Sequence, residues 1–302
     1  MRFGIMTMQR AALIPSEMGV EEALAYIATL DHADLARRLH GHGFDPIELG
    51  GDMVLFFPQS FSPDTVERLA ELKSETGVSY TVHLPLWSVE PSTPLRPVRQ
   101  GSVQALVDSV RAVQQVEPEC YVVHATGALA AEFYHMDLPE FARGLLMRQF
   151  QAYARESIQI LLAETGLPSR KLAIETVEFP FDLTLELAAD LDLSLCLDTG
   201  HVLAGFSGPL GLPEALERCL PRLAEIHLHD SPAFGSDGII HYGQDHRPLG
   251  TGDLDLGRFL DRLVEAEFEG PIIFELTVEE ALASLDVVRR RRPDVLGTKR
   301  PT

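Results

Sequence analysis

The chain has 302 residues, of which 45% are apolar and 23% charged, a composition typical of globular proteins. A formal net charge of −20 argues against nucleic acid as a partner, because DNA-binding surfaces neutralise phosphates with basic side chains. No apolar run reaches the roughly 18 residues of a membrane helix and no signal peptide is evident, so the sequence predicts a cytoplasmic protein without membrane contact.

Short apolar runs alternate with longer amphipathic segments along the whole chain. The first strand is expected at 2–6, followed by one helical pattern over 21–43, EEALAYIATLDHADLARRLHGHG. A second strand at 46–49 precedes a helix that starts with Ser62 as N-cap and closes on Gly77. The later strands are expected at 80–84, 120–124, 171–175, 194–199, 225–229 and 271–275, with helices at 254–270 and 278–292 after the last two.

Strict alternation of strands and helices predicts parallel pairing with right-handed crossovers. Eight such units in about 300 residues are the size of a single (β/α)8 TIM barrel. A doubly wound open sheet is the alternative, but its glycine-rich first turn is missing here. We expect the barrel to span 1–290 and a basic, disordered tail to span 291–302.

Six consecutive predicted strands carry a potential metal ligand at or near their C-terminal ends. These residues are His83, His124, Glu175, Asp198, His227 and Glu275. In a barrel those strand ends converge on one mouth. His201 follows Asp198 in the run LSLCLDTGHVL, and period-two alternation places His227 and His229 on one face.

Several carboxylates buried together would repel one another and become protonated unless a cation compensates them. Mixed imidazole and carboxylate ligands suit Zn, Mn, Fe or Co. The sequence therefore predicts a divalent metal, with two or more ions per chain. Asp245 and His246 lie in the segment after the seventh strand, where a solvated pair is the alternative interpretation.

Together these motifs resemble the xylose-isomerase-like TIM-barrel superfamily, which includes sugar phosphate isomerases and epimerases and endonuclease IV-like (AP endonuclease family 2-like) enzymes. The resemblance rests on VHLP with His83, VVHATG with His124, AIETVE with Glu175, DTGH at 198–201, IHLHD with His227, DHRPLGTGD at 245–253 and IFEL with Glu275. The segment IETVEFPFDLTLELAADLDLSLCLDTGHVL looks like the cobamide-remodelling phosphodiesterases of this superfamily. The N-terminal quarter matches that group poorly.

The resemblance implies how many metals are held. Sugar epimerases generally hold one metal, with the equivalents of Glu175, Asp198, His227 and Glu275. The phosphodiester-cleaving branch adds the equivalents of His83, His124, His201 and His246, and this sequence has all four. It departs at Gln244, where that branch has an aspartate, and Asp245 is expected to point elsewhere.

The first functional hypothesis is therefore a metal-dependent phosphodiesterase acting on a small phosphorylated molecule, such as the nucleotide loop of a cobamide. Its catalytic residues would be Glu175, Glu275 and His201. Trp87, Arg96, Arg99 and Arg247 would bind the substrate.

Three alternatives stay open. A sugar or sugar-phosphate isomerase or epimerase would use one metal and the pair Glu175 and Glu275. An abasic-site nuclease is compatible with the ligands but not with the acidic charge. The last alternative is a barrel that binds a metal or ligand without catalysing a reaction. The oligomeric state is not evident from the sequence.

Overall fold

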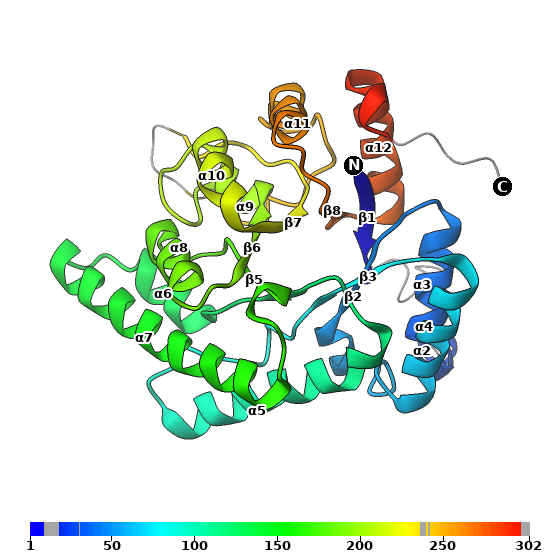
Figure 1. Cartoon of the computed structure of the whole chain (residues 1–302), viewed down its shortest axis with the longest axis horizontal. Coiled ribbons are helices and arrows are strands. Elements are labelled where there is room, and N and C mark those ends of the chain that lie inside the picture. Colours follow the sequence, from blue (N-terminus) through cyan, green and yellow to red (C-terminus); the bar gives the residue numbers. More distant parts are fainter. Residues whose placement is uncertain (9–17, 30, 236–239, 241, 297–302) are drawn as a thin grey trace.

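The computed structural model describes residues 1–8, 18–29, 31–235, 240 and 242–296. Its eight strands are parallel and close into one barrel in sequence order, with β8 returning to β1 (Figure 1). The predicted single (β/α)8 barrel is confirmed. The strands are β1 (Arg2–Met6), β2 (Ile47–Gly50), β3 (Tyr80–His83), β4 (Tyr121–Val123), β5 (Leu172–Glu175), β6 (Ser194–Asp198), β7 (Leu223–His227) and β8 (Pro271–Phe274).

The helices surround the strands on the outside of the barrel (Figure 1). They are α2 (Val20–Thr29), α3 (His32–Gly41), α4 (Pro63–Thr76), α5 (Arg96–Val113), α6 (Ala128–His135), α7 (Glu140–Thr165), α8 (Phe181–Asp190), α9 (Thr199–Ala204), α10 (Leu212–Cys219), α11 (Leu256–Glu265) and α12 (Val278–Arg291), with short 3₁₀ turns including η1 (Gly51–Leu55) and η5 (Pro293–Val295). Among the described residues, none of these helices is both long and apolar enough to cross a membrane.

The register of the strands sets the height of the polar residues inside the barrel. Asp198 pairs with His227 across β6 and β7, and Gly50 pairs with His83 across β2 and β3. Every residue of β6, SLCLD, is buried. A carboxylate at the end of such a strand therefore faces its neighbour at the mouth and not the solvent.

The single helix expected over 21–43 is wrong, because the structure has two helices there. Asp31 lies in an extended conformation and its side chain accepts hydrogen bonds from the N–H groups of Ala33 (2.6 Å) and Asp34 (3.4 Å). This N-cap starts α3 as a new helix. The amphipathic spacing on the two sides of Asp31 concealed the break.

The chain stays on the barrel beyond residue 290, so the predicted boundary of the tail is too early. Arg291 is the last residue of α12, and η5 follows it. Val295 is buried, and its carbonyl accepts a hydrogen bond from the amino group of Met1 at 3.1 Å. Residues 297–302 of the predicted tail lie outside the described residues.

Candidate metal centre

The six predicted ligands all stand at the C-terminal end of a strand. His83, Glu175, Asp198 and His227 are the last residues of β3, β5, β6 and β7. His124 and Glu275 each follow the last residue of their strands, β4 and β8. The structure brings all six into one cluster at the mouth of the barrel, where their side chains contact one another.

Glu175 is the centre of this cluster. Its Oε2 lies 3.0 Å from His83 Nε2 and 2.8 Å from His124 Nε2. Its Oε1 faces the other side, 3.3 Å from His201 Nδ1 and 3.7 Å from His227 Nδ1. One fully buried carboxylate therefore joins two separate groups of ligand atoms.

The second group surrounds His227. Its Nδ1 lies 3.3 Å from Glu275 Oε1 and 3.9 Å from Asp198 Oδ2. Asp198 is also the N-cap of α9, because its Oδ1 accepts the His201 N–H at 2.6 Å. The sequence DTGH thus has a local reason, because one oxygen of Asp198 starts a helix while the other faces His227 and His229 at the mouth.

A third group lies on the side of the mouth formed by the segment after β7. His246 Nε2 lies 3.0 Å from Glu275 Oε2, and His246 Nδ1 lies 2.6 Å from Asp245 Oδ2. The same Asp245 oxygen is 3.7 Å from His201 Nε2. The expectation that Asp245 points elsewhere is wrong. His246 has a φ of 57°, and this left-handed turn brings both side chains to one side.

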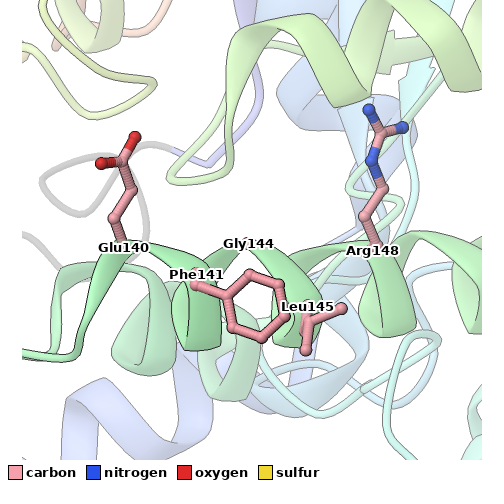
Figure 2. A pocket seen from close by; sticks show the side chains of 5 residues that line it. All are labelled: Glu140, Phe141, Gly144, Leu145 and Arg148. Atoms are coloured by element: carbon pink, nitrogen blue, oxygen red, sulfur yellow. The ribbon is translucent and has the colours of Figure 1, made fainter.

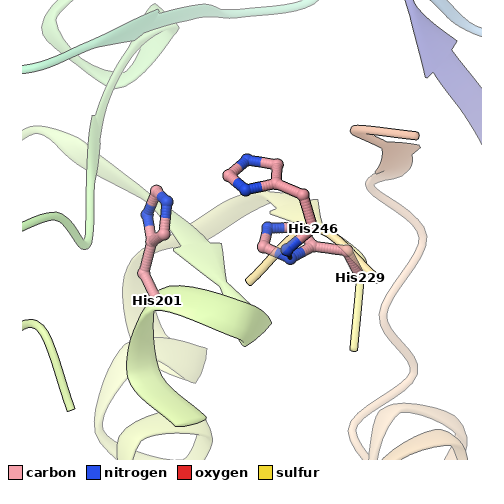
Figure 3. Close-up of side chains that lie close together, drawn as sticks. All are labelled: His201, His229 and His246. Atoms are coloured by element: carbon pink, nitrogen blue, oxygen red, sulfur yellow. Dashed lines mark hydrogen bonds between the residues drawn. The ribbon is translucent and has the colours of Figure 1, made fainter. Parts of the chain in front are cut away.

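His229 lies beside His201 and His246 (Figure 3) and connects the third group to Asp198 of the second. Its Nδ1 accepts the peptide N–H of His246 at 2.9 Å, so its proton resides on Nε2, which donates to Asp198 Oδ2 at 2.8 Å. The rings of His229 and His246 stack with centroids 4.1 Å apart. With both nitrogens engaged, His229 orients Asp198 and is not itself free to bind a metal. The predicted ligand set omitted His229, although its shared face with His227 was visible in the sequence.

Two further carboxylates lie below the mouth, and the sequence prediction missed them. Glu48 and Glu225 are both fully buried, with Glu48 Oε2 3.5 Å and Glu225 Oε1 3.8 Å from His227 Nε2. Glu225 also accepts hydrogen bonds from Thr81 and Cys120. Burial, then the nearby charge of Glu48, raises the pKa of Glu225 well above its usual value. An acidic residue inside an otherwise apolar strand was the available signal.

The carboxylates raise the pKa values of the histidines next to them. Burial would lower the pKa of His83, but its hydrogen bond to Glu175 and that group's charge raise it to about 9. The pKa of His201 is raised to about 9 in the same way, against burial, by Asp198 and Glu175. Burial also opposes the rise for His246, whose pKa reaches about 11 because both ring nitrogens face carboxylates. Protons and cations therefore compete for the same nitrogen lone pairs.

The donor atoms of the cluster fit divalent metal ions. Several buried nitrogens have no hydrogen-bond partner although carboxylate oxygens lie within 4 Å, namely His201 Nδ1 and both ring nitrogens of His227. Two triplets of ligand atoms close enough to share one ion are His83, His124 and Glu175, and Glu175, Asp198 and His227. Imidazole and carboxylate donors of this kind suit Zn²⁺, Mn²⁺, Fe²⁺ or Co²⁺.

Residues 36–291 match the sequence profile of the Xylose isomerase-like TIM barrel family. The chain belongs to this family. The superfamily that the sequence motifs resemble is thereby confirmed, and with it the fold. The profile covers every predicted ligand, from His83 to Glu275.

Three proteins similar to this chain share between 18% and 27% of their residues with it. An uncharacterised protein of Methanocaldococcus jannaschii is 22% identical over 258 residues, which cover 82% of this chain and 80% of that protein. Endonuclease 4 of Thermus thermophilus is 27% identical over 202 residues, covering 61% of this chain and 66% of that protein. The crystal structure of a D-tagatose 3-epimerase-like protein superposes with a TM-score of 0.69 at 18% identity, covering 96% of this chain and 97% of the other. The chain is thus similar in sequence to an endonuclease and in fold to an epimerase-like protein.

The four predicted substrate-binding residues of this family member differ in their surroundings. Trp87 is exposed in the segment after β3, and Arg96 is exposed in the first turn of α5. Arg247 donates from Nη2 to Gln244 Oε1 at 2.6 Å, next to His246.

Arg99 does not face the site, and its predicted role as a phosphate clamp is corrected. Its guanidinium donates to the Thr93 carbonyl at 2.8 Å and to Glu156 at 3.0 Å, and it lies over the Tyr153 ring at 4.4 Å. Glu156 and Tyr153 belong to α7. One turn beyond Arg96, the residue falls on the face of α5 that packs against α7.

Proposed function

We propose that this protein is a divalent-metal-dependent hydrolase that cleaves a phosphodiester in a small molecule. The observation that carries the proposal is the position of Glu175 between two ligand groups. His83 and His124 meet its Oε2, whereas His201 and His227 face its Oε1. An isomerase with one metal has no need for the first group as ligands. The sequence likeness to cobamide-remodelling phosphodiesterases makes the nucleotide loop of a cobamide the first substrate to assay.

The ligands divide into three sets for this function. His83, His124 and Glu175 would hold one ion, and Glu175, Asp198, His227 and Glu275 would hold a second. His201 and His246 would hold a third ion or contact the phosphate. The phosphodiester-cleaving branch has an aspartate at the position of Gln244, and Asp245 would take over its role here. Divalent cations in such sites activate water at neutral pH and offset the charge on the phosphoryl oxygens.

The side chains of this chain prepare the site for an anionic substrate. The carboxylates of Glu175, Asp198 and Glu275 would repel a phosphodiester unless cations neutralise them. His229 and the N-terminus of α9 fix Asp198 from two sides. In the metal-free protein burial would lower the pKa of His246, but the carboxylates on both ring nitrogens raise it to about 11, and a bound cation would displace this proton.

Water is the only reactant that the proposed hydrolysis needs besides the phosphodiester. Water supplies an oxygen to phosphorus, one P–O ester bond breaks, and the departing oxygen gains a proton. The products are a phosphomonoester and an alcohol. His246 is the most exposed of the proposed ligands, with 43% of its side chain exposed, and the ring of His201 lies 5.5 Å from it. These two side chains would transfer this proton.

A sugar or sugar-phosphate isomerase or epimerase is the second candidate. The observation that favours it is that Glu175 Oε1 and Glu275 Oε1 lie 3.7 Å and 3.3 Å from the same atom, His227 Nδ1. Two carboxylates that face one metal position could exchange a proton with a substrate carbon on either side. His83 and His124 would then bind substrate hydroxyls.

Metal content distinguishes the two candidates. Protein purified without chelators should contain two or more equivalents of Zn, Mn or Fe, measured by elemental analysis. The variant His83→Ala with His124→Ala should lose about one equivalent and the hydrolysis of cobamides and simple phosphodiesters. His42→Ala, an exposed histidine after α3, is the matched control and should change neither. One equivalent in the parent, unchanged in the double variant and accompanied by ketose isomerisation, would reject the phosphodiesterase.

A further inference from the structure

Two exposed aromatic side chains lie in the segments that follow β2 and β3 and take no part in the metal cluster. Phe56 and Trp87 are 50% and 53% exposed, and their rings meet edge to face with centroids 6.1 Å apart. Trp87 is four residues beyond the ligand His83, so their Cα atoms lie within about 14 Å of each other. We call Phe56 and Trp87 the β2–β3 wall, after the strands that precede them.

The β2–β3 wall has a fixed backbone. Asp52 is buried, and its Oδ2 accepts hydrogen bonds from the N–H groups of Leu86 (2.8 Å) and Trp87 (3.3 Å). This carboxylate links the segment after β3 to η1, and Phe56 directly follows η1. A wall held in place before a ligand arrives loses little conformational entropy on binding.

A second aromatic pair stands on the other side of the mouth. Tyr242 is 56% exposed and stacks on the buried ring of Phe206, with centroids 5.4 Å apart and an angle of 22° between the planes. Phe206 in turn lies 5.2 Å from the ring of His201. Tyr242 precedes His246 by four residues, so the same limit of about 14 Å between Cα atoms holds. We call this pair the β6–β7 wall.

The two walls follow strands on opposite sides of the barrel. In a closed ring of eight strands, β2 is opposite β6 and β3 is opposite β7. The walls follow the C-terminal ends of these four strands, so both lie at the mouth, with the metal cluster between them. A phosphodiester has the matching shape, because its two ester groups leave the phosphorus in different directions.

We propose that the site takes a phosphodiester whose two ester groups both carry flat unsaturated rings, one held on Phe56 and Trp87 and the other on Tyr242. This inference rests on the proposed phosphodiesterase function and specifies its substrate class. Aromatic rings stack on such side chains largely irrespective of the ring's identity. The walls therefore select a ring on each arm, and the metal cluster selects the phosphate.

Two substrates with the same leaving group test the second arm. Bis(4-nitrophenyl) phosphate carries two rings, whereas ethyl 4-nitrophenyl phosphate carries one. Each of Trp87→Ala and Tyr242→Ala should raise KM for the two-ring diester by roughly 5- to 100-fold, the range for loss of one stacking contact, with little change in kcat. The double variant should remove the preference for the two-ring diester. Trp87→Phe and Tyr242→Phe should keep it.

Phe141 supplies the matched control. It is an aromatic residue 79% exposed on α7, in a shallow pocket formed with Glu140, Gly144, Leu145 and Arg148 (Figure 2). None of these residues belongs to the cluster or the walls. Phe141→Ala should therefore leave both kinetic constants unchanged for both diesters.

Fluorescence tests binding without turnover, because Trp87 is the single tryptophan of the chain. Diphenyl phosphate should change the emission of the metal-loaded protein, and diethyl phosphate at the same concentration should not. The concentration of diphenyl phosphate needed should rise in Tyr242→Ala, although that residue is on the opposite wall.

The outcomes separate this inference from the function it rests on. Hydrolysis of both nitrophenyl diesters with KM values that neither alanine variant changes would overturn the two walls and leave the phosphodiesterase standing. Binding of diphenyl phosphate that depends on Tyr242, without hydrolysis of any diester, would uphold the walls and reject the hydrolytic function.

Discussion

Replacing His229 with alanine tests whether this histidine positions a ligand or is one itself. Its ring is fully buried and uses both nitrogens, accepting from the His246 N–H at 2.9 Å and donating to Asp198 at 2.8 Å. The replacement removes both hydrogen bonds but leaves Asp198 and His246 in the chain. We expect the number of bound metal ions to stay the same and their affinity to fall.

The magnitude follows from the role of the two hydrogen bonds. Loss of a residue that orients a metal ligand typically lowers metal affinity 10- to 100-fold. This range corresponds to about 1.4 to 2.7 kcal/mol of binding free energy. A hydrogen bond to a charged group such as Asp198 contributes roughly 1.5 to 3 kcal/mol, so the loss of that bond alone accounts for the effect.

Competition between the protein and a chelating indicator for Zn²⁺ measures the affinity, and elemental analysis at saturation measures the number of ions. His32→Ala is the matched control, because His32 is equally buried but bonds Thr7 at 2.8 Å, away from the ligand cluster. The control should lower the stability of the fold without changing metal affinity. Loss of a whole equivalent of metal in His229→Ala would show that His229 is a ligand, and unchanged affinity would show that it positions nothing.

Three further predictions concern the same cluster. Gly200→Ala should weaken Zn²⁺ binding in the same competition assay, because the added Cβ would lie 2.2 Å from the ring of His229, and an unchanged affinity would contradict this packing. In the metal-free protein, the raised pKa values of His83 and His201, about 9 against 6.5, contribute stability that is complete below pH 6.5 and lost as the pH rises through 9. Urea unfolding from pH 6 to 9.5 should show this fall, and a stability that rises with pH would refute the assignment. Zn²⁺ at about 100 times its Kd should raise the free energy of unfolding by about 2.7 kcal/mol for each ion bound, and Glu175→Gln should abolish this gain.

The strand ends could be predicted because, in a barrel, the sequence of each strand is enough to show where that strand reaches the mouth. An apolar run that stops at a carboxylate or histidine marks the end of a buried strand, and all such ends meet at one mouth. His83, Glu175, Asp198 and His227 were found in this way and are the last residues of their strands.

The orientations of Asp245 and Arg99 were predicted wrongly because they depend on contacts that no local pattern reports. Asp245 turns into the mouth because His246 adopts a left-handed conformation, which the sequence of a loop does not reveal. Arg99 turns away from it because α7 offers Glu156 and Tyr153 on the adjoining helix face. Each outcome is decided by a neighbour that is distant in sequence or by one backbone torsion.

The sequence by itself determined the barrel, the order of its strands and the six candidate ligands at their ends, because burial and alternation are properties of short segments. Only the tertiary structure decided which side-chain atoms of these residues lie next to one another. Glu175 joins two groups, and His229 bonds Asp198 through one ring nitrogen and the His246 N–H through the other. Two pairs of aromatic rings, Phe56 with Trp87 and Phe206 with Tyr242, form in segments that follow different strands. These arrangements depend on which strands close the ring and on side-chain directions within it, and both arise only when the whole chain has folded.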